Sequence, residues 1–110
     1  LTMVNIDARL QEDSIHVIDL SLCRVFLKKD SENPWLVLVP LKENKTEIID
    51  LEISDQNTLM EEIRRCSHAI QKVFAPDKLN VAALGNIVPQ LHVHVIARYK
   101  KDRAWPNPIW

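Results

Sequence analysis

Two histidines stand one residue apart in an otherwise apolar run, "VPQLHVHVIAR", at residues 88–98. Side chains along a β-strand alternate between its two faces, so Gln90, His92 and His94 would share one face at intervals of roughly 6.5–7 Å. Imidazole, with an unperturbed pKa near ~6.5, can act as a nucleophile, base or acid close to neutral pH. Two imidazoles on one open face could flank a single phosphate group.

The pattern alone leaves three interpretations open. The histidines can be ordinary strand residues whose ring nitrogens bond to the backbone. They can form a metal site, because alternate histidines on a strand can chelate an ion; that site needs a third ligand, and His16 and His68 lie on other segments. They can also carry out phosphoryl or nucleotidyl transfer, one attacking and the other assisting.

The segments that would position the histidines predict an α+β domain, with helices on one face of an antiparallel sheet. Residues 7–14 give a weak signal for a short helix, and the tail "WPNPIW" is expected to be extended and packed. Four apolar segments predict strands: 15–29, 35–40, 79–84 and 90–99. The first of these is either two strands or one strand bent around Ser21.

A long helix is predicted between about Ser54 and Pro76, which stops it. Thr58 and Glu61 have the spacing of a capping box. Apolar residues recur at steps of three and four, which makes one stripe able to pack on the apolar face of the histidine strand: Leu59, Ile63, Cys66, Ile70 and Val73.

Composition limits the class of protein. A chain of 110 residues with 46% hydrophobic residues fits one domain over residues 1–110. The net charge of -1 gives no electrostatic reason to expect a nucleic acid or a membrane as partner, and no segment approaches the ~20 apolar residues of a membrane span. Two cysteines are too few for a disulfide framework, which favours a reducing, cytoplasmic setting.

"VPQLHVHVI" resembles the signature of the histidine triad family, in which three histidines alternate with hydrophobic residues and two more hydrophobic residues follow. The resemblance extends to Asn80 and the turn at Gly85 and Asn86, to "AWPNP" after the motif and to "PWLVLVP" upstream. It covers most of the chain from about residue 20. "NVAALGNIVPQLHVHVIAR" looks especially like small bacterial members described as diadenosine tetraphosphate hydrolases.

The resemblance implies an antiparallel sheet of about five strands with one long and one short helix, joined to a second sheet across a homodimer. It implies cleavage at the α-phosphate of a nucleoside phosphate ester, amidate or dinucleoside polyphosphate, with a purine nucleotide or dinucleoside polyphosphate as ligand. His92 matches the nucleophile, which forms a covalent nucleotidyl-histidine, and His94 matches the histidine that contacts phosphate oxygens and assists the leaving group. No cofactor or metal is required, although polyphosphates often arrive with Mg²⁺.

Three positions depart from the family pattern. Gln90 replaces the first histidine, Trp35 stands where many members carry another histidine, and Ile87 falls near the usual place of a hydroxyl. In the family a backbone carbonyl at the first position orients the nucleophile, so the Gln90 substitution need not abolish activity. Glutamine cannot take up or release a proton as histidine can, however. The rival prediction is therefore a nucleotide-binding protein with little or no turnover.

The resemblance also suggests substrate-binding residues besides Gln90. Asn80 and Asn86 would supply amides near the phosphate, Asp30 would accept the ribose hydroxyls, and Trp105 would close over the pocket, in some relatives that of the partner subunit. Alternative roles remain open at this stage: Asn80 as a strand-end cap, Asp30 as a solvated turn residue and Trp105 as interface packing.

Overall fold

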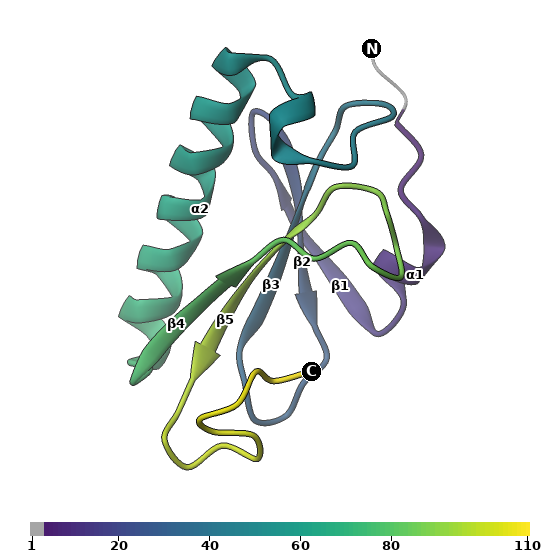
Figure 1. Ribbon diagram of the computed structural model, residues 1–110. Helices are drawn as coiled ribbons and strands as arrows, with labels where there is room; N and C mark the ends of the chain where they lie inside the picture. Colours follow the sequence, from purple (N-terminus) through teal and green to yellow (C-terminus); the bar gives the residue numbers. More distant parts are fainter. Residues whose placement is uncertain (1–3) are drawn as a thin grey trace.

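Five strands form one antiparallel sheet in the computed structural model, which describes residues 4–110 (Figure 1). The strand order is β1-β2-β3-β5-β4, and the predicted sheet is confirmed. Segment 15–29 is two strands rather than one bent strand. The strands are β1 (Ser14–Asp19), β2 (Cys23–Lys28), β3 (Trp35–Pro40), β4 (Lys78–Ala82) and β5 (Val93–Arg98), and the helices are α1 (Ala8–Gln11), the 3-10 turn η1 (Ile48–Asp50) and α2 (Ile53–Phe74).

Helix α2 covers one face of the sheet (Figure 1). Four residues of its predicted stripe are buried against the strands, whereas Val73 is 69% exposed, which corrects the prediction at that position. The buried four are Leu59, Ile63, Cys66 and Ile70. The strand residues they meet alternate as a period of two requires: Leu91, Val93, Val95 and Ala97 all lie in this core.

The predicted capping box in this helix is wrong. Helix α2 begins at Ile53, so Thr58 lies in its interior and donates a hydrogen bond to the Ser54 carbonyl at 3.1 Å. Glu61 is paired with Arg64 instead. The helix starts within one residue of the predicted Ser54, two residues after buried Leu51. It ends at Phe74, where Ala75 adopts a left-handed conformation ahead of Pro76.

A second apolar cluster lies on the opposite face of the sheet. Leu10 of α1 and Ile109 of the tail pack there on Trp35, Val37 and Ile96, so helices lie on both faces rather than one. The face that carries the histidines is therefore partly covered, and His92 is only 7% exposed. In the part of the chain that the structure describes, no helix is long and apolar enough to cross a membrane.

Candidate functional site

His92 precedes the first residue of β5, and its ring is held by the backbone two residues earlier. Nδ1 of His92 lies 2.7 Å from the carbonyl oxygen of Gln90. A carbonyl can only accept a hydrogen bond, so Nδ1 must carry the proton. The lone pair of the neutral ring is then on Nε2. The structure thus gives His92 the tautomer that a nucleophile attacking through Nε2 needs.

His94 is oriented by a different kind of partner. Nε1 of Trp35 lies 2.9 Å from Nδ1 of His94. The indole N–H can only donate, so Nδ1 of His94 is the acceptor and the proton of the neutral ring is on Nε2. Burial, followed by the charges of His92 and Lys28, lowers the pKa of His94 from 6.5 to about 4. At neutral pH His94 is therefore an uncharged donor through Nε2.

Both histidines line a cavity of about 330 Å³. The two ring centroids are 5.0 Å apart, and Trp35 and Trp110 close one side of the space. The turn at residues 84–88 forms another wall, with Gly85 at a φ of 74° that suits glycine. The size falls at the lower end of the range for small-molecule sites.

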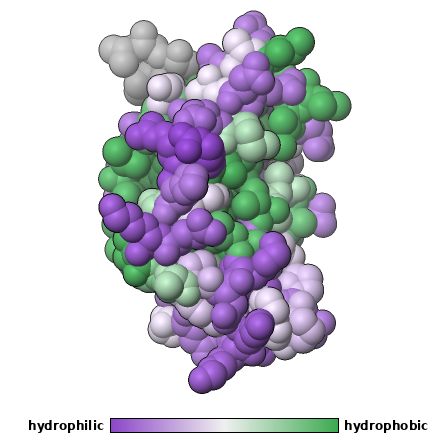
Figure 2. Space-filling model, turned by 90° about the vertical axis from the view of Figure 1, so that its left-hand side faces the viewer, coloured by the Kyte–Doolittle hydropathy of each residue, from purple (hydrophilic) through white to green (hydrophobic). Residues whose placement is uncertain are grey.

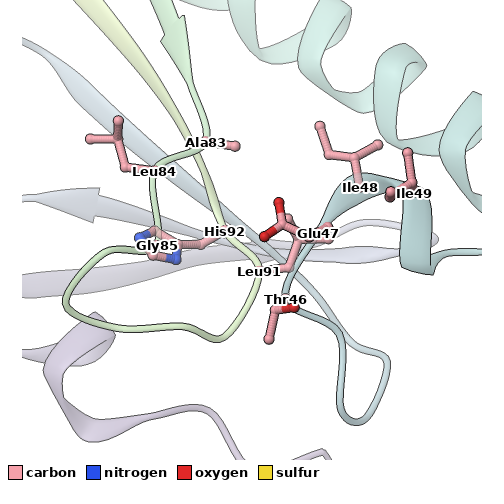
Figure 3. A pocket seen from close by; sticks show the side chains of 9 residues that line it. All are labelled: Thr46, Glu47, Ile48, Ile49, Ala83, Leu84, Gly85, Leu91 and His92. Atoms are coloured by element: carbon pink, nitrogen blue, oxygen red, sulfur yellow. The ribbon is translucent and has the colours of Figure 1, made fainter.

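A second cavity of about 250 Å³ adjoins His92 on another side. Figure 3 shows its walls: η1 and the preceding loop, which carry Thr46 and Glu47, face the segment with Ala83 and Leu84. The carboxylate of Glu47 points into this space (Figure 3). The two cavities next to His92 therefore differ in charge, because the one with His94 is lined by Lys28 and no carboxylate.

Of the substrate-binding residues suggested by sequence, Asn86 lines the cavity with the histidines. Gln90 contributes its backbone carbonyl, but its side chain points to the N-terminal segment. Its Oε1 accepts from the Asp7 N–H at 2.8 Å, and its Nε2 donates to the Asn5 carbonyl at 3.2 Å.

The other three suggested residues do not line this cavity; each contacts an arginine instead. Asn80 accepts from Arg98 at 2.8 Å, and the Arg98 guanidinium lies 5.6 Å from the centre of the Trp105 ring. Asp30 accepts from Arg103 at 2.8 Å, which holds the pKa of its carboxyl near 2. The structure therefore places these residues in polar contacts with arginines, and they are not among the residues that line the cavity with the histidines.

Sequence reasoning did not assign Trp110 and Lys28 to the site. Trp110 contacts both Trp35 and His94, at ring-centroid distances of 5.8 and 5.3 Å. Lys28 lies at the end of β2 with its ammonium 4.5 Å from the Trp35 ring centre. The alternation Arg24, Phe26, Lys28 in β2 was the available signal, since it places Lys28 on the same face as buried Phe26.

Across residues 4–110, no group of three or more histidine, cysteine, aspartate or glutamate side chains is arranged to hold a metal ion. His16, which the metal interpretation would need, pairs with Asp19 at 2.8 Å on the surface. Cys23 and Cys66 are buried free thiols, and burial raises the pKa of both. The arrangement of side chains thus does not favour the metal interpretation.

A family model described as the HIT domain matches residues 9–101. The chain belongs to the histidine triad family. A solved histidine triad protein from Bradyrhizobium japonicum is 51% identical with a TM-score of 0.94, over 97% of this chain and 80% of that one.

Two more solved histidine triad proteins are similar, each 42% identical. The one from Sinorhizobium meliloti has a TM-score of 0.96 and matches over 99% of this chain and 81% of its own. The one from Marinobacter aquaeolei has a TM-score of 0.94 and matches over 98% and 79%. No curated protein matches the chain. Histidine triad proteins are in general nucleotide-binding hydrolases or transferases, and membership supports that general class here.

Proposed function

We propose that this histidine triad protein hydrolyses a nucleoside phosphate bond at the α-phosphorus through a nucleotidyl-His92 intermediate. The observation that carries the proposal is the pair of complementary tautomers beside one cavity. Gln90 O fixes a lone pair on Nε2 of His92, and Trp35 fixes a proton on Nε2 of His94. In these tautomers one ring offers a lone pair to the substrate and the other offers a proton.

In the first step Nε2 of His92 forms a bond to phosphorus while the bond from phosphorus to the leaving group breaks. The electron pair of that bond stays on the leaving group. His92 becomes a nucleotidyl-imidazolium whose Nδ1–H still donates to the Gln90 carbonyl. Nε2–H of His94 donates to a phosphate oxygen, or to the leaving oxygen, as negative charge grows there, and such stabilisation is usually the largest contribution to catalysis.

In the second step water attacks phosphorus, the phosphorus–nitrogen bond breaks and its electron pair returns to Nε2 of His92. Water loses its proton to solvent, and the released nucleoside monophosphate leaves the ring in its original tautomer. Splitting one displacement into two lowers each barrier. The proposed ligand is a purine nucleotide or dinucleoside polyphosphate, bound with its α-phosphate between His92 and His94.

A protein that binds nucleotides without turnover is the second candidate. It is favoured by the Gln90 side chain, which is bonded to Asn5 and Asp7 and so supplies neither a proton nor a contact in the cavity. Against it stands the Gln90 backbone carbonyl, which holds His92 whatever side chain the residue carries.

A fluorogenic adenosine phosphoramidate tests the choice between the two. Brief incubation followed by intact-mass measurement should find the protein heavier by one adenylyl group, absent in His92→Ala. Steady fluorophore release should accompany it. Binding of adenosine monophosphate with no release above the His92→Ala control would contradict the enzymatic proposal and favour the binding protein. His68→Ala, on the helix surface, is the matched control.

We also propose that two copies pair through β4 and α2 to form a homodimer, as the resemblance to the family implies. Of the two edge strands, β1 carries an irregularity between His16 and Ile18 that discourages pairing, whereas β4 has none. On the α2 side of the molecule, Figure 2 shows hydrophobic surface on either side of a hydrophilic band. The exposed hydrophobic residues of α2 and β4 are Ile53, Met60, Val73, Phe74 and Val81.

Sedimentation equilibrium tests the dimer. Val81→Lys should convert it to a monomer, whereas Ile49→Lys, at a more exposed site on η1, should leave it intact. A wild-type monomer at micromolar concentration would overturn this proposal.

The buried free thiols Cys23 and Cys66 support a reducing compartment, and we propose the cytoplasm.

A further inference from the structure

Lys28, Trp35 and His94 form a row across three neighbouring strands. Leu27 of β2 pairs with Leu36 of β3, so the next residues in this register, Lys28 and Trp35, lie beside each other. His94 of β5 pairs with Val37, which is two residues from Trp35 and on the same face of the sheet. All three side chains therefore lie on one face. The ammonium of Lys28 lies 4.5 Å from the centre of the Trp35 ring, whose N–H donates to His94 at 2.9 Å. One tryptophan therefore holds both a cation and an imidazole at the same cavity.

Lys28 is the sole charged side chain among the residues lining that cavity. The ion pairs found between residues 4 and 110 do not include Lys28, and none of the hydrogen bonds there uses its ammonium. It is half-buried and is held by the face of Trp35 rather than by a carboxylate. The Lys28 ammonium is thus available to bind an anion. Its charge also helps to lower the pKa of His94.

The adjoining cavity has the opposite character. Its lining includes the Glu47 carboxylate, which points into the space in Figure 3, and no cation. A chain of phosphates reaching away from the phosphorus that His92 attacks would be repelled on the Glu47 side and attracted on the Lys28 side. The charges on the two sides of His92 therefore select the direction in which the phosphate chain runs.

We propose that Lys28 binds the phosphate next to the scissile bond, so that the preferred substrate has a phosphate leaving group, as in a nucleoside or dinucleoside polyphosphate. This inference rests on the proposed function. During attack by Nε2 of His92, the bond from the α-phosphorus to the bridging oxygen breaks, and the electron pair stays on that oxygen. The leaving phosphate gains one negative charge, which Lys28 neutralises while Nε2–H of His94 donates to the bridging oxygen. Water then displaces His92 as before.

Two substrates with one adenylyl group and different leaving groups test the proposal. Diadenosine tetraphosphate releases an anionic polyphosphate, whereas an adenosine phosphoramidate with an uncharged amine does not. Lys28→Gln should lower kcat/KM for diadenosine tetraphosphate by about 10- to 100-fold, the size expected for a lost charge-assisted contact. It should lower kcat/KM for the phosphoramidate by a clearly smaller factor. Lys29→Gln, one residue along on the exposed surface, is the matched control.

Lys28→Arg keeps the positive charge and should retain most of the preference for diadenosine tetraphosphate, which also serves if Lys28→Gln folds poorly. Equal losses with both substrates, or no loss with either, would overturn the inference. If the wild type turns over neither substrate, the proposed function has failed separately. Calorimetry then decides about Lys28: Lys28→Gln should weaken binding of adenosine triphosphate by about tenfold and that of adenosine monophosphate much less, and parallel changes would refute it.

Discussion

The indole N–H of Trp35 donates to Nδ1 of His94 at 2.9 Å, across the pairing of β3 with β5. Because the indole cannot accept a hydrogen bond, this contact determines which nitrogen of His94 faces the cavity with a proton. Protonating His94 at Nδ1 would require the Trp35 bond to break. Trp35 is thus a positioning residue for His94, at a sequence position where many relatives have a histidine.

Replacing Trp35 with phenylalanine keeps most of the ring packing and removes the donor. We expect the Trp35→Phe protein to lose about fivefold in kcat, the size of one hydrogen bond of about 1 kcal/mol. The ¹⁵N chemical shifts of the His94 ring should move toward a mixture of tautomers, while those of His92 should not change. Trp105→Phe, outside the cavity, is the control. Unchanged His94 shifts in Trp35→Phe would show that another group sets the tautomer.

Burial of His94 predicts a specific acid sensitivity. Its pKa is lowered from 6.5 to about 4, so between these values the unfolded chain binds a proton that the folded chain does not. The free energy of unfolding contributed by this group is fully present above about pH 6.5 and falls as the pH drops toward 4. Asp30, with a pKa near 2, loses its contribution only below this interval.

Urea unfolding at about pH 7 and about pH 4.5 measures this effect. The wild-type midpoint should fall over this interval, and that of His94→Gln should fall less. His16→Gln, which removes a surface histidine, should behave as the wild type does. Parallel loss of stability in the wild type and in His94→Gln would mean that His94 is protonated equally easily in both states.

The sheet and the position of the histidines could be predicted because a period of two specifies which side chains share a face. The tautomer of His94 could not, since it depends on the register that brings Trp35 beside it. A helical period likewise marks a face without telling what covers it, and Val73 proved exposed. The spacing of Thr58 and Glu61 indicated a capping box, but helix α2 starts at Ile53, so both residues lie in its interior.

Three residues that the resemblance assigned to substrate binding lie away from the cavity, because contacts between distant parts of the chain position them. Asn80, Trp105 and Asp30 each meet an arginine whose position depends on contacts distant in sequence. Charge pairing between a strand and the tail cannot be read from either segment alone. The family motif drew attention to two histidines that lie beside a cavity, but it could not tell which polar neighbours the fold would use for its own stability.

The side chain of Gln90 predicts a role in stability. Its two hydrogen bonds, to Asp7 N–H and the Asn5 carbonyl, attach the N-terminal segment to the segment that carries His92 into β5. Gln90→Ala should reduce the free energy of unfolding by about 1 kcal/mol and speed hydrogen exchange of the Asp7 amide. Because the backbone carbonyl remains, kcat should change by less than about threefold. Gln11→Ala, which removes one surface bond to the Ile6 carbonyl, should have a smaller effect.

A different result for Gln90→Ala would indicate that its side chain has a role in the reaction. If the variant keeps its stability but no longer forms the adenylyl adduct, the side chain takes part in the reaction, and the structural role assigned to it is wrong. Gln90→His, which restores the family's first histidine, should not increase kcat by more than about threefold, because the carbonyl that orients His92 is the same in both proteins.

The ion pair between Arg98 and Asp102 predicts the largest loss of stability. Both side chains are 2% exposed, and Asp102 bonds to Arg98 at 2.8 and 3.1 Å while also accepting from Asn33 and three backbone N–H groups of the tail. Asp102→Asn leaves the buried Arg98 charge without its partner, which costs about 3 kcal/mol or more. Arg98 also donates to the Asn107 carbonyl, so the tail that carries Trp110 to the cavity should loosen.

Chemical unfolding and tryptophan fluorescence check this expectation together. Arg103→Gln removes an exposed pair with Asp30 and should cost no more than about 1 kcal/mol. Asp102→Asn should unfold at a much lower urea concentration and expose the half-buried Trp105, whose ring lies beside Arg98, to a soluble quencher before the global transition. Equal losses in Asp102→Asn and Arg103→Gln would contradict the importance of the buried pair. A large loss without early exposure of Trp105 would mean that the tail is held independently of Arg98.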